Sequence, residues 1–185
     1  MAITAKDSGS FDRELPTGGL QHAVFSKIHD LGMQLNDYNG QTSYQHKVLV
    51  TWELAEVMKE GDYAGKRFVV HKEYTLSLSK KANLRRDLES FKSKKMTDEQ
   101  AAEGFDLEKL LKVQCTLNLV IATSRGGNDY VKVDGVLPAQ SDAPMLVPEL
   151  PDDWCPEWVK AKIAEGAGAE GDVSKKDFVD DEVPF

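Results

Sequence analysis

The chain has 185 residues, enough for one domain of ordinary size plus a tail, and its hydrophobic fraction of 41% is slightly low for a chain that packs throughout. The polar N-terminus argues against a signal peptide, and no apolar run approaches the roughly 20 residues that cross a bilayer. Two cysteines, Cys115 and Cys155, without a secretory signal predict free thiols in a reducing compartment. We therefore expect a cytoplasmic protein.

The net charge of −8 is unevenly distributed along the chain. Residues 141–185 contain twelve acidic and four basic residues, which accounts for the whole excess. Residues 66–95 instead contain ten basic residues and three acidic ones. A basic segment that also carries aromatic residues suits a polyanion with flat bases, whereas the plain alternative is a solvated helix face.

Hydrophobic alternation and turn signals predict five strands. Residues 1–18 are expected to be a flexible leader, Gly32 to mark a bulge, and Asn39-Gly40 to form a hairpin turn. A helix is predicted from about Ala82 to Lys92, and a capping box at Thr97 predicts another helical turn. The predicted strands are Leu20–Leu35, Tyr44–Leu54, Arg67–Leu78, Val113–Ala122 and Tyr130–Val136.

Five strands with a helix between the third and the fourth follow the element order of the OB-fold. We therefore predict an all-β domain with a helical insert, a five-stranded OB-fold barrel over residues 19–140. In that fold, the face of strands two and three holds oligonucleotides. The basic stretch falls on the third strand and on the helix that follows it.

The composition changes after residue 140. Residues 141–165 are rich in proline and predict an extended segment with a short helix from near Pro156 to Gly166, whose tryptophans pack back on the barrel. Residues 166–185 are predicted to be a disordered acidic tail. The tail ends in acidic residues followed by apolar ones, and an apolar pocket rimmed by Arg or Lys is the kind of site that binds such a sequence. The tail residues predicted to bind partner proteins are Asp180, Asp181, Glu182, Val183, Pro184 and Phe185.

This ending resembles the acidic tip of bacterial single-stranded DNA-binding proteins, which finishes Asp-Asp-Asp-Ile-Pro-Phe. Residues 19–139 resemble phage-encoded single-stranded DNA-binding proteins in pattern and order, through the pieces HDLGMQLNDYNG, KVLVTWEL, KEYTLSLSKKANLRRDLESF and GFDLEKLLKVQCTLNLV. The resemblance implies a role in phage DNA replication, recombination or repair. It also implies that the tip recruits replication or recombination proteins.

The predicted function is binding of single-stranded DNA with little sequence preference. Lysine and arginine would neutralise phosphates, and aromatic rings would stack on bases. Each aromatic candidate has a core alternative, because Trp52, Phe68 and Tyr74 share parity with apolar neighbours. A homo-oligomer is compatible with the sequence. The DNA-binding candidates are Lys47, Trp52, Arg67, Phe68, Lys72, Tyr74, Lys80, Lys81, Arg85, Arg86, Arg125, Tyr130 and Lys132.

Two other functions are alternatives for this sequence. One is a small metal-dependent nuclease, for which Glu53 with Glu56, or Asp152 with Asp153, would supply carboxylates. The other is a protein–protein adaptor that uses the barrel. The histidines are scattered, neither cysteine lies in a C-x-x-C pair, and a phosphate-binding glycine loop is missing from the sequence. We therefore expect no catalysis, no metal and no cofactor.

Overall fold

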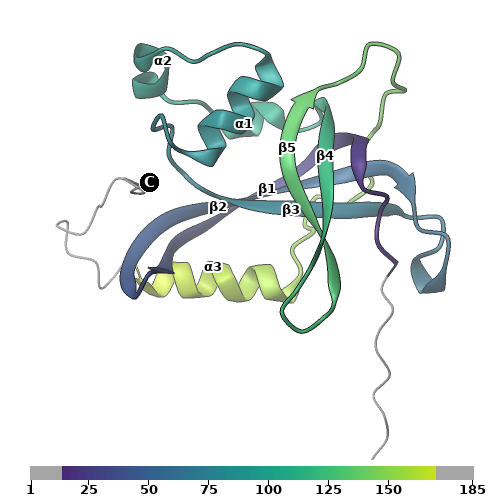
Figure 1. The fold of residues 1–185 in the computed structure, drawn as a ribbon, viewed down its shortest axis with the longest axis horizontal. Helices are drawn as coiled ribbons and strands as arrows, with labels where there is room; N and C mark the ends of the chain where they lie inside the picture. The colour runs from purple at the N-terminus through teal and green to yellow at the C-terminus, as the bar shows by residue number, and fades with distance from the viewer. Residues whose placement is uncertain (1–13, 170–185) are drawn as a thin grey trace, which may run out of the picture.

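The computed structural model describes residues 14–169 (Figure 1). Within them, five strands form one antiparallel sheet in the order β3-β2-β1-β4-β5. The mostly-β class and the helical insert between the third and fourth strands are as predicted. The elements are β1 (Gly19–Tyr38), β2 (Gln41–Val57), the 3-10 turn η1 (Gly61–Tyr63), β3 (Arg67–Thr75), α1 (Asn83–Lys92), α2 (Asp98–Glu103), the 3-10 turn η2 (Leu107–Leu110), β4 (Gln114–Thr123), β5 (Asp129–Pro138) and α3 (Glu157–Ala169).

The hairpin of β1 and β2 is the longest pairing in the sheet, running from Tyr38 opposite Gln41 to Ala23 opposite Leu54. Asn39 and Gly40 both have positive φ, 52° and 78°, which suits an Asn-Gly turn between two strands. The register shifts between Asp30 and Gly32, so the predicted bulge is confirmed. Gly32 has a φ of 67°, a conformation that glycine adopts at little cost.

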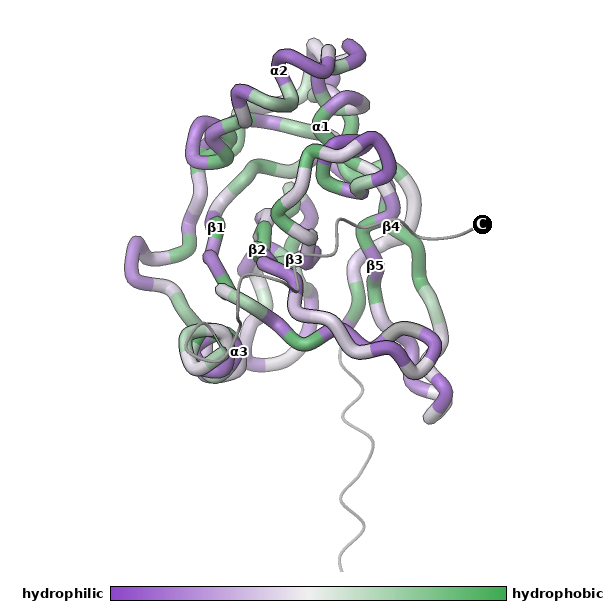
Figure 2. Tube along the Cα trace, turned by 90° about the vertical axis from the view of Figure 1, so that its left-hand side faces the viewer, coloured by the Kyte–Doolittle hydropathy of each residue, from purple (hydrophilic) through white to green (hydrophobic). Residues whose placement is uncertain are grey.

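Alternate side chains of β2 form the centre of the main core. Trp52 is 1% exposed, and its ring centre lies 5.4 Å from that of Phe25 on β1. Leu84 and Leu88 of α1 join the same core, so the predicted apolar stripe of this helix faces the sheet. In both Figure 1 and Figure 2, α1 and α2 lie on one side of the sheet and α3 lies on the other.

A second, smaller core lies beneath α3. Val159 of α3 packs against Leu31 of β1 and Leu49 of β2, and all three are at most 1% exposed. The expectation that this segment packs back on the sheet is therefore confirmed, but through Val159 and not through Trp158, which is 41% exposed. Gly166 does not end the helix as predicted, since α3 continues to Ala169. Its lack of a side chain instead lets the helix approach the bulge of β1, where its backbone lies against the carbonyl of Leu31.

The chain before β1 is also bound to the domain. The Glu14 carboxylate accepts hydrogen bonds from the backbone N–H groups of Lys59 and Glu60, and Thr17 donates to Glu56. The expected flexible leader, residues 1–18, therefore has its last five residues anchored beside the β2–β3 connection. Across residues 14–169, no helix combines the length and the apolar character needed to cross a membrane. Cys115 and Cys155 are both free, as expected.

Candidate nucleic-acid interface

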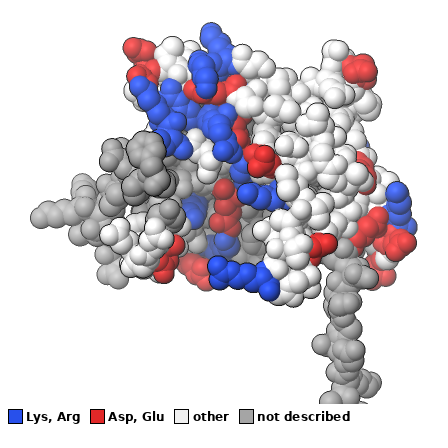
Figure 3. Space-filling view, in the orientation of Figure 1, with Lys and Arg blue, Asp and Glu red and all other residues white. Residues whose placement is uncertain are grey.

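The basic stretch of the sequence, residues 66–95, forms β3, α1 and the turns that flank α1. Figure 3 shows lysine and arginine side chains gathered over α1 and continuing toward the middle of the molecule, with carboxylates among them. The surface is therefore basic, but part of its charge is already paired. The contacts of each candidate decide which side chains remain available to a ligand.

Arg85 holds α1 to the segments on both sides of it. Its guanidinium donates to the carbonyls of Leu78 and Met96, at 3.2 and 2.6 Å, and to the Glu89 carboxylate at 3.1 Å. The residue is 7% exposed. Arg85 is thus a structural residue in this conformation, and its charge is turned away from solvent.

A buried carboxylate, Asp87, neutralises a second part of the basic stretch. It accepts from Lys72 Nζ at 2.7 Å, from the Tyr74 hydroxyl at 2.9 Å and from Arg86 Nε at 3.2 Å. Burial, together with the charge of Asp87, raises the pKa of the Tyr74 phenol well above its usual range. This cluster ties α1 to β3, and it keeps Lys72 and Tyr74 from reaching a ligand.

Three of the four stacking candidates lie in the core. Trp52, Phe68 and Tyr74 are 1%, 5% and 3% exposed, so no base can stack on their rings in this conformation. The core position of these three residues is the alternative that their parity with apolar neighbours indicates. Tyr130 is the exception, because its side chain is 47% exposed.

The β2 part of the face expected to hold oligonucleotides is covered by the chain's own C-terminal part, whereas His71 and Glu73 of β3 remain exposed. The Glu53 carboxylate of β2 accepts the backbone N–H groups of Glu149 and Leu150, at 2.8 and 3.0 Å. Trp158 packs its ring 5.0 Å from that of His71 on β3. The packing of this segment against the sheet was expected, but its position over the predicted ligand face was not.

Two further basic candidates lie at the edges of this covered face. Arg67 donates to the carbonyl of Val147 at 2.7 Å and lies 3.3 Å from a Glu149 oxygen, so it holds the C-terminal segment in place. Lys47 is half-buried on β2, opposite Thr75 on one side and Gly32 on the other. Neither belongs to an open basic surface.

The structure brings the remaining candidates together along β5. Tyr130 and Lys132 point outward, whereas Val133 points into the core. Lys132 lies opposite Val120 of β4, which is 42% exposed. Arg86 extends this row from α1, because its guanidinium reaches the backbone carbonyl of Asp134 at 3.5 Å. We call Arg86, Val120, Tyr130 and Lys132 the β5 strip.

Three other exposed basic candidates lie in loops next to the elements that carry the β5 strip. Arg125 lies in the β4–β5 hairpin loop, and Lys80 and Lys81 lie in the connection from β3 to α1. Lys80 pairs with Asp98 at 2.9 Å, but both side chains are largely exposed, so solvent screens this pair. Val120 was not among the sequence candidates, since only the register of β4 and β5 places it beside Lys132.

Carboxylates that a nuclease would use already have partners in the domain, and Asp152 lies 3.8 Å from Lys27 Nζ. Glu53 also accepts from the Ser26 hydroxyl, and Glu56 binds Thr17. Within residues 14–169, no three His, Cys, Asp or Glu side chains gather in a way that could hold a metal ion. The tail candidates, Asp180 to Phe185, lie outside the described residues.

No protein-family model matches the chain, and comparisons with curated proteins and with solved structures gave no significant match.

Proposed function

We propose that this chain is an OB-fold protein that binds single-stranded DNA with little sequence preference. The sheet order supports the fold, since β1 lies between β2 and β4, and β3 approaches β5 at the other side. In this proposal, β3 and β5 close the five strands into a barrel, and the helical insert lies between the third and fourth strands as the OB-fold requires.

The β5 strip carries the functional part of the proposal. It offers an exposed aromatic ring, Tyr130, two residues from Lys132 on the outer face of β5, with the apolar Val120 of β4 opposite Lys132. Stacking of a base on such a ring contributes about 1–3 kcal/mol and tolerates any base, because every base has a π-face. Lys132 and Arg86 lie where they can neutralise phosphates along the same path.

In this proposal the DNA binds on the β4–β5 side of the barrel and not on the β2–β3 face. The hydrogen bonds of Glu53 and the packing of α3 favour this position, because DNA on β2 and β3 would first have to displace residues 149–163. The resemblance of the tail to the acidic tip of bacterial proteins supports the second half of the proposal. In it, residues 180–185 recruit proteins of DNA replication, recombination or repair.

The function is tested by titrating the full-length chain with single-stranded and double-stranded oligonucleotides of equal length at several salt concentrations. We expect tighter binding to the single strand, with an affinity that falls with salt by a slope of about 0.7 for each phosphate contacted. Equal affinity for mixed-sequence and oligo-dT single strands would support weak sequence preference. No binding to single strands at low salt would reject the proposal and favour the adaptor function.

A further inference from the structure

The helical insert contains a pocket of about 330 Å³. It is lined by α1, the turn after it, α2 and the segment that returns to the sheet, and none of the β5 strip residues line it. Its volume lies near the lower end of the roughly 300–1,000 Å³ that small-ligand pockets occupy. The pocket therefore suits one aromatic side chain and its neighbours.

The turn after α1 shapes one wall of this pocket. Ser93 ends the helix with a φ of 51°, which turns the chain back toward α1. The Glu89 carboxylate accepts the backbone N–H of Met96 at 2.9 Å and pairs with Lys95 at 3.2 Å. The next helix, α2, starts at the predicted capping box, in which Thr97 and Gln100 bond reciprocally. These contacts fix the position of Met96, and the Lys94 N–H donates to the backbone carbonyl of Glu89 at 3.1 Å, which fixes the backbone of Lys94.

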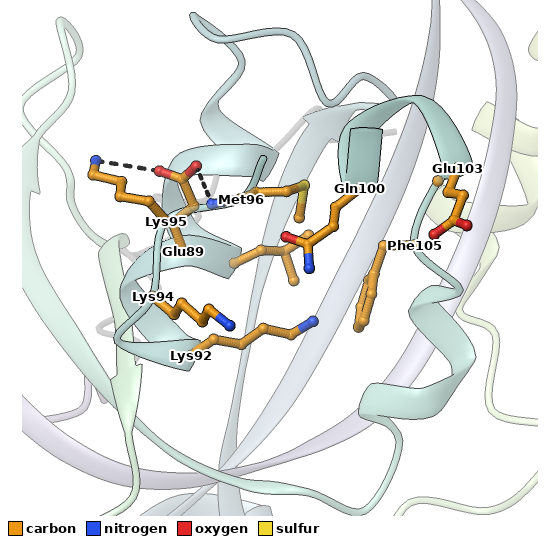
Figure 4. A pocket seen from close by; sticks show the side chains of 10 residues that line it. Glu89, Lys92, Lys94, Lys95, Met96, Gln100, Glu103 and Phe105 are labelled. Carbon is orange, nitrogen blue, oxygen red and sulfur yellow. Dashed lines mark hydrogen bonds and ion pairs between the residues drawn. The ribbon is translucent and has the colours of Figure 1, made fainter. Parts of the chain in front are cut away.

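The pocket combines an apolar floor with cations that point over it. Leu88, Met96 and Phe105 provide the apolar surface, and Lys92 Nζ lies 3.8 Å from the centre of the Phe105 ring. Figure 4 shows Lys92 and Lys94 pointing into the same space beside Phe105, whereas Lys95 turns away to Glu89. Within the described part of the chain, Lys92 and Lys94 form no ion pair with a carboxylate. Glu103 also lines the pocket, on the far side of Phe105 from Lys92 (Figure 4), so a ligand with carboxylates beside an aromatic ring complements the Lys92 and Lys94 side.

We propose that residues 180–185 of the same chain bind in this pocket. They read DDEVPF, so three carboxylates precede a valine, a proline and a phenylalanine. The Phe185 ring would lie on the Phe105 side of the floor, and Asp181 and Glu182 would face Lys92 and Lys94. Charge-assisted contacts of this kind are among the stronger ones a surface pocket offers.

The tail is long enough for this contact within one chain. Sixteen residues, 170–185, follow the end of α3, and an extended chain spans at most about 3.6 Å per residue, or about 55 Å here. A domain of this size has a radius of gyration of about 15 Å. In Figure 1 the C-terminal end of α3 and the helix α2 both lie toward the left of the view, on opposite sides of the sheet, so the tail would pass around the sheet to reach the insert. Tethering raises the local concentration of the tip to roughly the millimolar range, which favours binding within the chain.

Docking in the pocket would withhold the tip from other proteins until they compete for it. This consequence rests on the proposed function of the tail, whereas the docking itself requires neither DNA nor a partner. It also differs from competition with DNA, because the pocket and the β5 strip share no residue.

The test places the photo-crosslinking residue p-benzoylphenylalanine at position 185 of the full-length chain, without DNA, and maps the crosslinks by mass spectrometry. We expect them between residues 88 and 105, within single chains when isotopically light and heavy proteins are mixed. Lys92→Glu with Lys94→Glu should reduce their yield by about fivefold or more, since attraction becomes repulsion. The matched control, Lys59→Glu with Lys66→Glu on the β2–β3 connection, should leave the yield unchanged.

The inference would be overturned by crosslinks that concentrate on the β5 strip or that join different chains. An unchanged crosslink yield in the variant with Lys92→Glu and Lys94→Glu would also overturn it. Adding oligo-dT should leave the pocket crosslinks in place, and their displacement would assign the pocket to DNA instead. Far-ultraviolet circular dichroism of each variant shows that it is folded. A chain that fails to bind DNA but gives the expected crosslinks would reject the proposed function and keep this inference.

Discussion

Gly166 of α3 lies against the backbone carbonyl of Leu31, at the point where β1 bulges. A Cβ built at residue 166 would overlap that carbonyl, and one built at Gly32 would lie 3.1 Å from the Gly166 carbonyl carbon. Two glycines therefore let a helix and a strand approach each other through their backbones. This contact fixes how α3 lies over β1 and β2.

Gly166→Ala is expected to destabilise the protein by about 1–3 kcal/mol, because the added methyl group forces the helix away from β1. Gly168→Ala is the matched control in the same helix, since a Cβ there meets nothing within 4 Å. That control should be neutral, or stabilising by up to about 1 kcal/mol, because alanine favours helix. Urea unfolding measures both, and equal shifts in the same direction would contradict the proposed close contact.

Glu53 provides the second attachment of the C-terminal segment. Glu53→Ala leaves the N–H groups of Glu149 and Leu150 without their acceptor, and each unpaired buried group costs about 1–3 kcal/mol. We expect faster hydrogen exchange at these two amides and easier proteolysis of residues 140–156. Glu56→Ala, which removes only the contact with Thr17, should change neither. Unchanged protection at 149 and 150 in Glu53→Ala would refute the attachment.

Neighbouring arginines of α1 should respond differently to substitution. Arg85→Ala removes hydrogen bonds to two carbonyls and to Glu89, and we expect a loss of stability of about 2 kcal/mol or more. Arg86→Ala should affect stability less and weaken binding of single-stranded DNA across all sequences, because its side chain is exposed beside β5. Parallel denaturation and binding curves separate the two effects. Weaker DNA binding in Arg85→Ala, together with a larger loss of stability in Arg86→Ala, would place the DNA on the other side of α1.

Much of this arrangement is readable in the sequence. The succession of strands and helices along the chain, the Asn39-Gly40 turn, the Gly32 bulge and the capping box at Thr97 all follow from local patterns, which the structure confirms. The two faces of α1 were readable as well. At about 100° per residue, Arg86 lies opposite the stripe of Leu84 and Leu88, whereas Arg85 lies at its flank.

The burial of the second face of β2 by the C-terminal segment was harder to predict. The run from Val48 to Leu54 is apolar at five of its seven positions, which favours a strand buried on both faces, but the sequence does not say what buries the second face. The long-range contacts of Glu53 with residues 149 and 150 supply that answer. The pairing of Val120 with Lys132 likewise depends on a register shift in β4 and β5 that no local pattern marks.

The pKa of Glu89 predicts a pH dependence for the turn after α1. The Met96 N–H and the Arg85 side chain hold the pKa of this carboxyl at about 2, against a usual value of 4.5. A lowered pKa in the folded state contributes stability that is present above about pH 4.5 and is lost as the pH falls toward 2. The difference in Tm between the native chain and Glu89→Gln should therefore be largest above pH 4.5 and should shrink toward pH 2. A difference that is constant across this range would contradict the ionised state of Glu89.

The most direct test of DNA binding at the β5 strip compares two double variants of the full-length chain. Tyr130→Ala with Lys132→Ala removes the exposed ring and the cation of the strip. Lys59→Ala with Tyr63→Ala removes an exposed lysine and tyrosine on the β2–β3 connection, where the ring is more exposed than that of Tyr130. We predict that the first variant binds oligo-dT at least about tenfold more weakly, with a salt slope lower by about 0.7, while the second binds like the native chain. Native affinity and slope in the first variant would contradict DNA binding at β5.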